Sequence, residues 1–144
     1  TAPPRAGLND AQALAARMAG FQGRYLALAH VPFPLRRSTL EKYFEAHPQA
    51  LRDQVAHRWR HPSQFEPVAL SFHLEMKAGR AIVEPDAQLL YLNPRRFSAR
   101  RLRRRLRRAQ DDPSLIFACF QSLDAATPQH QQIVLDWMSQ RLAA

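Results

Sequence analysis

The pattern of apolar and polar positions predicts a helix near the start of the chain. Behind a potential cap at Asn9, apolar side chains recur every three or four residues, which is the helical period. These positions are Leu14, Met18, Phe21, Tyr25 and Leu28. We therefore expect a helix that begins at Asp10 and ends before the segment HVPFPL at residues 30–35, because proline breaks the helical hydrogen bonds.

Two further helices are expected between residues 38 and 59. Ser38 stands three residues before Glu41, which is the spacing of a capping box at a helix start. Pro48 should end that helix and suits the first position of the next one, where its missing N–H is not needed. Apolar residues follow Pro48 at intervals of four, and they predict a helix with Trp59 turned into the core. These residues are Leu51, Val55 and Trp59.

The period changes to two in residues 68–76, VALSFHLEM. Five apolar residues alternate there with smaller or polar ones, which favours a half-buried strand. Ala78 and Gly79 can form a turn, residues 80–84 a return strand and residues 88–92 a third strand. The pattern thus predicts a small antiparallel meander.

The last third of the chain predicts helices again. Asp112 precedes Pro113, and Thr127 precedes Pro128, so each pair offers a capping side chain and a proline suited to the first helical position. The first pair predicts a central, apolar helix over residues 113–123. The second predicts a final helix with four apolar residues on one side: Ile133, Val134, Trp137 and Met138.

Together these elements predict an α+β fold, in which helices flank a small antiparallel sheet and an arginine-rich helix lies on the surface. An all-α fold is the alternative, because the Leu, Met and Ala residues of 68–76 also favour helix. The length of 144 residues suits one domain. We expect a flexible lead over residues 1–7 and a single globular domain over residues 8–144.

Positive charge is concentrated in one short segment. The chain has 21 Lys and Arg against 12 Asp and Glu, a net charge of +9. Nine arginines lie between residues 95 and 108, where no acid occurs, so the rest of the chain is balanced. Codon bias can account for arginine in place of lysine, but it does not account for this clustering. The candidate polyanion-binding residues are Arg95, Arg96, Arg100, Arg101, Arg103, Arg104, Arg105, Arg107 and Arg108.

We expect a helix over residues 99–109, with Ser98 as a potential cap. Such a helix has one narrow apolar stripe. The stripe consists of Ala99, Leu102, Leu106 and Ala109. Arginines three or four residues apart form eight like-charge pairs, and at roughly 0.3 kcal/mol each they destabilise the helix by about 2 kcal/mol at low salt. A chain that keeps such repulsion is expected to meet an anion at this surface.

Phosphate is the anion that suits these side chains. The planar guanidinium group binds phosphate oxygens in pairs and stacks on bases, and Phe97 at the edge of the run offers a further stacking surface. No Asn or Gln lies between the arginines, which favours contacts to backbone phosphates over base readout. The sequence predicts a non-enzymatic module that binds a polyanion, preferably nucleic acid (DNA or RNA).

Three other interpretations of the arginine helix stay open. In the first interpretation, the protein is an adaptor or assembly subunit whose basic helix contacts an acidic protein partner. Alternatively, acids elsewhere in the fold, such as Glu41, Glu45, Asp53 or Asp136, neutralise a solvated face. An anionic membrane surface is the third possibility, although the apolar stripe is thin and lacks Trp or Phe.

Other candidate chemistry is weak. His57 and His61 are four residues apart and can face one metal ion if a helix persists there, but the motif H-E-x-x-H is not present. His73 falls between Ser71 and Glu75 on the polar face of the expected strand, where a solvated face explains the three residues better than a catalytic relay. We therefore expect no enzyme, no cofactor and no metal site.

Cys119 is the only cysteine, so no intrachain disulfide can form, and its apolar neighbours indicate a buried position. The sequence has no apolar stretch of 18 residues, so we expect no transmembrane helix. The first residues, TAPPRAG, contain neither a methionine nor a signal-peptide pattern, which indicates a trimmed or processed chain. We expect a cytoplasmic protein.

Overall fold

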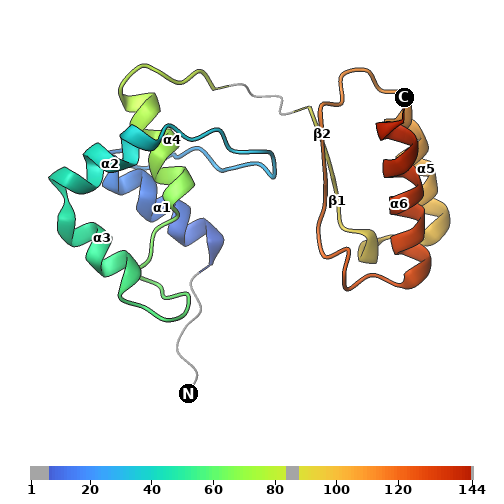
Figure 1. The fold of residues 1–144 in the computed structure, drawn as a ribbon, viewed down its shortest axis with the longest axis horizontal. Coiled ribbons are helices and arrows are strands. Elements are labelled where there is room, and N and C mark those ends of the chain that lie inside the picture. Colours follow the sequence, from blue (N-terminus) through green and yellow to red (C-terminus); the bar gives the residue numbers. More distant parts are fainter. Residues whose placement is uncertain (1–6, 84–87, 144) are drawn as a thin grey trace. The chain divides into compact units, whose positions relative to one another are not determined.

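The computed structural model describes residues 7–83 and 88–143, and it contains both helices and a small sheet (Figure 1). The mixed α+β class is confirmed. The chain divides into two compact units, of which unit 1 holds the described residues up to Val83 and unit 2 those from Gln88. The prediction of one domain over residues 8–144 placed no boundary here, and the expected lead lies outside the described residues except for residue 7.

Four helices form the described part of unit 1. They are α1 (Leu8–Met18), α2 (Arg37–Ala46), α3 (Pro48–Val55) and α4 (Pro67–Lys77). α1 packs against α4, and α2 contacts both α3 and α4 (Figure 1). Pro48 opens α3, as its position in the sequence predicted.

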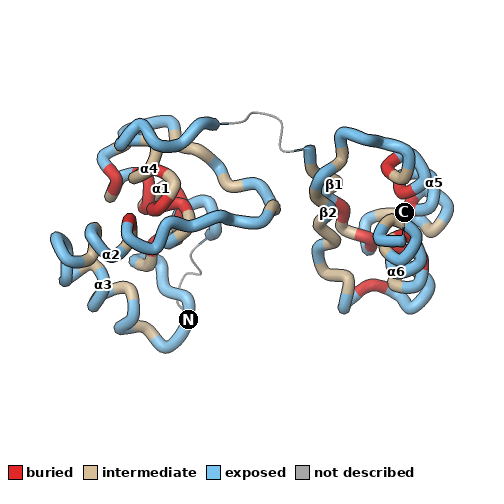
Figure 2. Tube along the Cα trace, turned by 45° about the horizontal axis from the view of Figure 1, so that its top comes forward, coloured by how far each residue is buried: buried red, intermediate tan, exposed pale blue. Residues whose placement is uncertain are grey.

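Small side chains let α1 and α4 approach each other closely. Ala15 and Ala69 are fully buried, Ala19 is 2% exposed, and Leu70 and Phe65 complete the same cluster. Figure 2 shows the buried part of this unit concentrated along these two helices. Close packing of this kind stabilises unit 1 through many dispersion contacts and the burial of apolar surface.

The strand predicted over residues 68–76 is wrong, because this segment belongs to helix α4. Pro67 lies in the first turn, and the carboxylate of Glu66 accepts a hydrogen bond from the backbone N–H of Ala69. These residues give α4 the start signals of a helix, which the alternating pattern concealed. His73 is fully buried on α4, so the expected solvated strand face is wrong as well.

An irregular segment over residues 19–36 is held to the helices by two buried side chains. The side-chain oxygen of Gln12 accepts a hydrogen bond from the N–H of Leu28 at 3.0 Å. The Nε2 of His73 accepts one from the N–H of Leu26 at 3.1 Å, while Nδ1 lies 2.6 Å from a carbonyl oxygen of its own helix. Because Nε2 accepts, Nδ1 carries the proton and donates it. His73 therefore has a structural role.

The first helix is shorter than its apolar period predicted. α1 ends at Met18, whereas the period continues to Leu28. Gly20 and Gly23 follow with φ angles of 94° and 81°, which other residues rarely adopt. These two glycines turn the chain out of the helix.

Two further expectations in unit 1 are corrected. Ser38 does not cap α2, which begins at Arg37, and Glu41 instead accepts a hydrogen bond from the Arg37 guanidinium at 2.6 Å. Because α3 ends at Val55, Trp59 lies beyond the helix and is 76% exposed rather than turned into the core.

Unit 2 contains a crossover between two parallel strands. Its described elements are β1 (Leu89–Leu92), the 3₁₀ turn η1 (Pro94–Arg96), α5 (Ala99–Gln110), β2 (Phe117–Phe120) and α6 (Pro128–Leu142). Leu89 pairs with Phe117 and Leu92 with Phe120. Figure 1 shows α5 and α6 on the same side of the two strands. Thr127 caps α6 through its side chain, as predicted.

The antiparallel meander is wrong, because the two strands of the described residues run parallel. Residues 80–83 form no strand, and Glu84 lies outside the described residues. The helix predicted over residues 113–123 is also wrong. The side chain of Asp112 accepts hydrogen bonds from the N–H and hydroxyl of Ser114 and makes a turn, and the short apolar run that follows forms β2.

The core of unit 2 is built from β1, α5 and α6. Leu92, Leu102 and Val134 are at most 1% exposed, and Trp137 is 7% exposed. Phe120 of β2 meets the Trp137 ring edge-on, with ring centres 5.7 Å apart. This core fixes which face of α5 points inward.

Candidate functional site

The predicted amphipathic form of α5 is present in the structure. Its apolar stripe is used in the core, where Leu102 is 0%, Leu106 2% and Ala109 7% exposed. Ser98 caps the helix, because its hydroxyl oxygen accepts a hydrogen bond from the N–H of Arg101 at 3.4 Å. Packing of this stripe on α6 leaves the rest of α5 to solvent.

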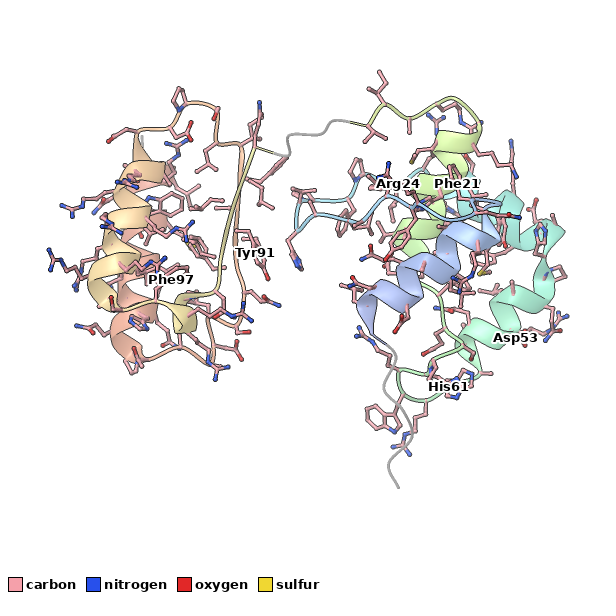
Figure 3. All side chains as sticks on the ribbon, turned by 180° about the vertical axis from the view of Figure 1, so that it is seen from behind. Phe21, Arg24, Asp53, His61, Tyr91 and Phe97 are labelled. Atoms are coloured by element: carbon pink, nitrogen blue, oxygen red, sulfur yellow. The ribbon has the colours of Figure 1, made fainter. Side chains whose placement is uncertain are left out.

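All nine candidate arginines are exposed. Seven lie on α5, and Arg95 and Arg96 lie in η1 just before it. Figure 3 shows nitrogen-tipped side chains projecting from α5 on the side away from the strands. The surface formed by these nine side chains is called the arginine surface below.

The described residues contain no ion pair between the arginine surface and a carboxylate. The ion pairs found among the described residues join arginines of unit 1 to acids of unit 1. Asp53 and Asp136, two acids considered for neutralising the helix, accept hydrogen bonds from the side chains of Gln49 and Gln132 at 2.6 and 2.7 Å. The arginine surface thus keeps its charge within the described parts of the fold.

Phe97 orders two of the arginines. The guanidinium carbons of Arg101 and Arg105 lie 5.3 and 5.1 Å from the centre of its ring, within reach of a cation–π attraction. Phe97 also packs against the core of unit 2, and Figure 3 marks its position. The ring that the sequence suggested as a stacking surface for a ligand therefore supports these two guanidinium groups.

Three arginines point most directly away from the core. A helical rotation of 100° per residue places Arg104 opposite the stripe, with Arg100 and Arg108 on either side of it. Arg100, Arg104 and Arg108 form one row, in which successive side chains are about 6 Å apart along the helix axis. A row of evenly spaced guanidinium groups can contact successive charged groups of an extended anion.

Arg141 of α6 holds the other end of α5, a role that the sequence did not reveal. Its guanidinium group donates hydrogen bonds to the carbonyl oxygen of Gln110, the last residue of α5, and to those of Asp112 and Leu115 at 3.1 and 3.3 Å. The bond to Gln110 satisfies a carbonyl group that the helix end leaves free, and the other two hold the turn that follows α5. The hydrogen bonds from Ser114, with Arg141 nearby, lower the pKa of the Asp112 carboxyl below its usual range.

The two histidines weighed as metal ligands contact each other instead. The rings of His57 and His61 are stacked with centres 3.9 Å apart, and the Ser63 hydroxyl lies 3.1 and 2.7 Å from one nitrogen of each ring. Neither residue is in a helix, because α3 ends before them. Within the described ranges, no three His, Cys, Asp or Glu side chains are grouped to hold a metal ion. Cys119 is half-buried in β2.

No protein-family model, no curated protein and no solved structure matches the chain. Each helix of residues 7–83 and 88–143 is too short or too polar to cross a membrane.

Proposed function

We propose that the protein binds a polyanion through the arginine surface, with nucleic acid as the preferred ligand and phosphate groups as the main contacts. The observation that carries this proposal is the exposure of nine arginines without an ion-pair partner among the described residues. The absence of an enzymatic reaction and the cytoplasmic location stay predictions from the sequence.

Two structural features support this proposal. First, the like-charge pairs on α5 are not relieved by carboxylates of the described residues, so an external anion would remove a repulsion of about 2 kcal/mol. Second, the apolar stripe is already buried in the core of unit 2, so α5 has no free apolar face for inserting into a lipid layer. Charge, rather than apolar contact, is what this surface offers to a partner.

Salt dependence of binding tests this proposal. The affinity of the full chain for duplex and single-stranded nucleic acid should be measured by fluorescence anisotropy over a range of salt concentrations. If about five arginines contact duplex phosphates, log K falls against log salt with a slope of about −4.5. Absence of binding at about 50 mM salt would remove nucleic acid as the ligand.

A matched pair of triple variants shows where binding occurs. Substituting Arg100, Arg104 and Arg108 by Gln should reduce the slope by about 2.7, because three phosphate contacts are lost. The control substitutes three exposed arginines of unit 1 by Gln and removes the same net charge; these are Arg17, Arg24 and Arg52. Equal losses from the two variants would show that net charge, and not the arginine surface, determines binding.

An acidic protein partner is the alternative that the same surface allows. Poly-glutamate serves as a probe with carboxylates and no phosphate. If the chain binds poly-glutamate more tightly than nucleic acid at equal salt, and the α5 variant abolishes this binding, the ligand is an acidic protein segment. Guanidinium groups form paired hydrogen bonds with both anions, so their relative affinity has to be measured.

A further inference from the structure

A second concentration of positive charge lies in unit 1, in a cavity of about 460 Å³ next to α2 and α4. Arg36, Lys42 and Arg80 contribute three cationic side chains to its lining. Its volume is within the range of pockets that hold small ligands. All three cations belong to unit 1, so the cavity is separate from the arginine surface.

Glu75 is the acid that balances part of this charge. Its carboxylate accepts two hydrogen bonds from Arg80, at 2.8 and 3.0 Å, and one from the hydroxyl of Thr39. These bonds lower the pKa of Glu75 to about 2, so it carries a full negative charge at neutral pH. Arg36 is more distant, at 3.8 Å from this carboxylate. Glu75 therefore pairs with two of the three cations, and no ion pair of Lys42 is present among the described residues, so an excess of positive charge is left along the lining.

The rest of the lining is partly aromatic and apolar. The rings of Tyr43 and His47 stack with centres 4.4 Å apart and an angle of 18° between their planes. The side chain of Leu74 adds an apolar surface. This lining places a flat ring surface in the same cavity as the cations, which suits a ligand that has an anionic group and an organic ring.

The first turn of α2 also borders the cavity. Ser38 of this turn lines it, and no side chain caps the helix at Arg36. The N–H of Thr39 already donates to the carbonyl oxygen of Arg36, but the positive end of the helix dipole favours an anion at this position. This effect adds to that of the three cations.

We propose that this cavity binds a small phosphate monoester, with the phosphate group at Arg36, Lys42 and Arg80 and the organic group against Tyr43 and His47. The proposal does not depend on the function of the arginine surface. It rests on one cavity that combines an excess of cations with an aromatic wall.

Titration calorimetry of the full chain with phenyl phosphate and with inorganic phosphate tests this site. The titrations use the variant with Gln at positions 100, 104 and 108, so that the arginine surface contributes less phosphate binding. Phenyl phosphate should bind more tightly than inorganic phosphate, because the ring gains contacts that the free ion lacks. Failure of phenyl phosphate to bind at about 10 mM would overturn the proposal.

Two substitutions on α2 locate the binding site. Lys42→Ala should weaken phenyl phosphate binding about tenfold, because a charge-assisted hydrogen bond is lost. Arg37→Ala is the matched control: it is the neighbour of Arg36, its side chain is 89% exposed, and it pairs with Glu41 outside the cavity lining. The control should retain nearly full affinity. Equal weakening by both substitutions would overturn the assignment to this cavity.

Glu75→Gln changes the charge in the opposite direction. Removing the carboxylate charge should strengthen phenyl phosphate binding severalfold, because Arg80 and Arg36 no longer neutralise an acid. A fall in affinity, with an unchanged far-UV circular dichroism spectrum, would contradict the proposal. If Glu75→Gln unfolds unit 1, the comparison of Lys42→Ala with Arg37→Ala decides the question alone.

Discussion

The two units differ in whether their arginines form ion pairs with nearby acids. Residues 7–83 contain ten Lys and Arg against six Asp and Glu, a balance of +4, and residues 88–143 contain ten against four, a balance of +6. The net charges of the two units are similar, but the positions of their arginines relative to acids differ more. In unit 1, Arg36, Arg37 and Arg80 form ion pairs with nearby acids.

In unit 2, the nine arginines of η1 and α5 form no ion pair within the described residues. The four acids of residues 88–143 all lie C-terminal to this run. The comparison teaches that net charge alone does not identify a binding surface. What distinguishes the arginine surface is clustering without ion pairs among the described residues, even though Asp111 follows Arg107 and Arg108 at helical spacing.

The largest effect is expected where α5 contributes to the core. Leu106→Ala should destabilise unit 2 by about 3 kcal/mol, because it removes a side chain that is 2% exposed. Leu70→Ala should cost unit 1 a similar amount, since Leu70 is fully buried. Urea unfolding of the full chain measures both: the fluorescence of Trp137 in a Trp59→Phe background reports on unit 2, and far-UV circular dichroism also reports on the helices of unit 1.

An exposed position on the same helix gives the control for Leu106. Arg107→Ala should not destabilise unit 2, and at high salt, where charge repulsion is screened, it should change the free energy of unfolding by less than about 0.5 kcal/mol. A loss below about 1 kcal/mol for Leu106→Ala would contradict the orientation of α5 that exposes the arginines.

The next effect concerns Arg141, which donates hydrogen bonds to backbone carbonyl groups. Arg141→Ala should destabilise unit 2 by about 2 kcal/mol, because the carbonyl oxygens of Gln110, Asp112 and Leu115 lose a charged donor. Arg141→Lys should restore only part of this loss, since one ammonium group cannot reproduce the planar guanidinium fork. Urea unfolding followed by Trp137 fluorescence measures this change, and equal stability of the Lys variant and the original protein would argue against the fork geometry.

A smaller change in the free energy of unfolding should have opposite signs for an arginine of α5 and for an ion-paired arginine of unit 1. Arg104 takes part in four of the eight like-charge pairs on α5, so Arg104→Gln should stabilise unit 2 by about 1 kcal/mol at low salt. Arg37→Gln should destabilise unit 1 by about 0.3 kcal/mol, because it removes an exposed pair with Glu41. Thermal unfolding at about 10 mM and about 500 mM salt measures both changes, which should shrink as salt screens the charges.

Stabilisation by Arg104→Gln that persists at high salt would mean that helix propensity or packing, and not charge repulsion, is the cause. Destabilisation at low salt would show that Arg104 has a partner that holds it in place. Either result would remove the main physical argument for an external anion at α5.

A capping residue followed by proline predicted the start of a helix correctly only where the following residues also make helical contacts in the fold. Thr127 before Pro128 begins α6, but Asp112 before Pro113 makes a turn through Ser114. Glu66 before Pro67 begins α4, although the alternation that follows favoured a strand. The same dipeptide pattern therefore leads to different structures, because the contacts of the following residues decide the outcome.

The arginine surface and the cavity of unit 1 also differ in how far the sequence could predict them. The arginine surface followed from the spacing of Leu102 and Leu106, since one apolar stripe on a helix forces the remaining residues outward. The cavity in unit 1 could not be predicted, because Lys42 and Arg80 are far apart in the sequence and meet only through the packing of α2 and α4. Arg141 was equally hidden, as its contacts lie 26 to 31 residues away.

By itself, the sequence determined the amphipathic form of α5, the concentration of arginine and the mixture of helices with some strand, because these depend on neighbours within one or two helical turns. Only the tertiary structure decided that residues 68–76 are helical and that β1 and β2 run parallel. Parallel pairing between residues 89–92 and 117–120 requires a crossover connection, which here contains α5. The choice between helix and strand in a short apolar run is made by the surfaces against which it packs.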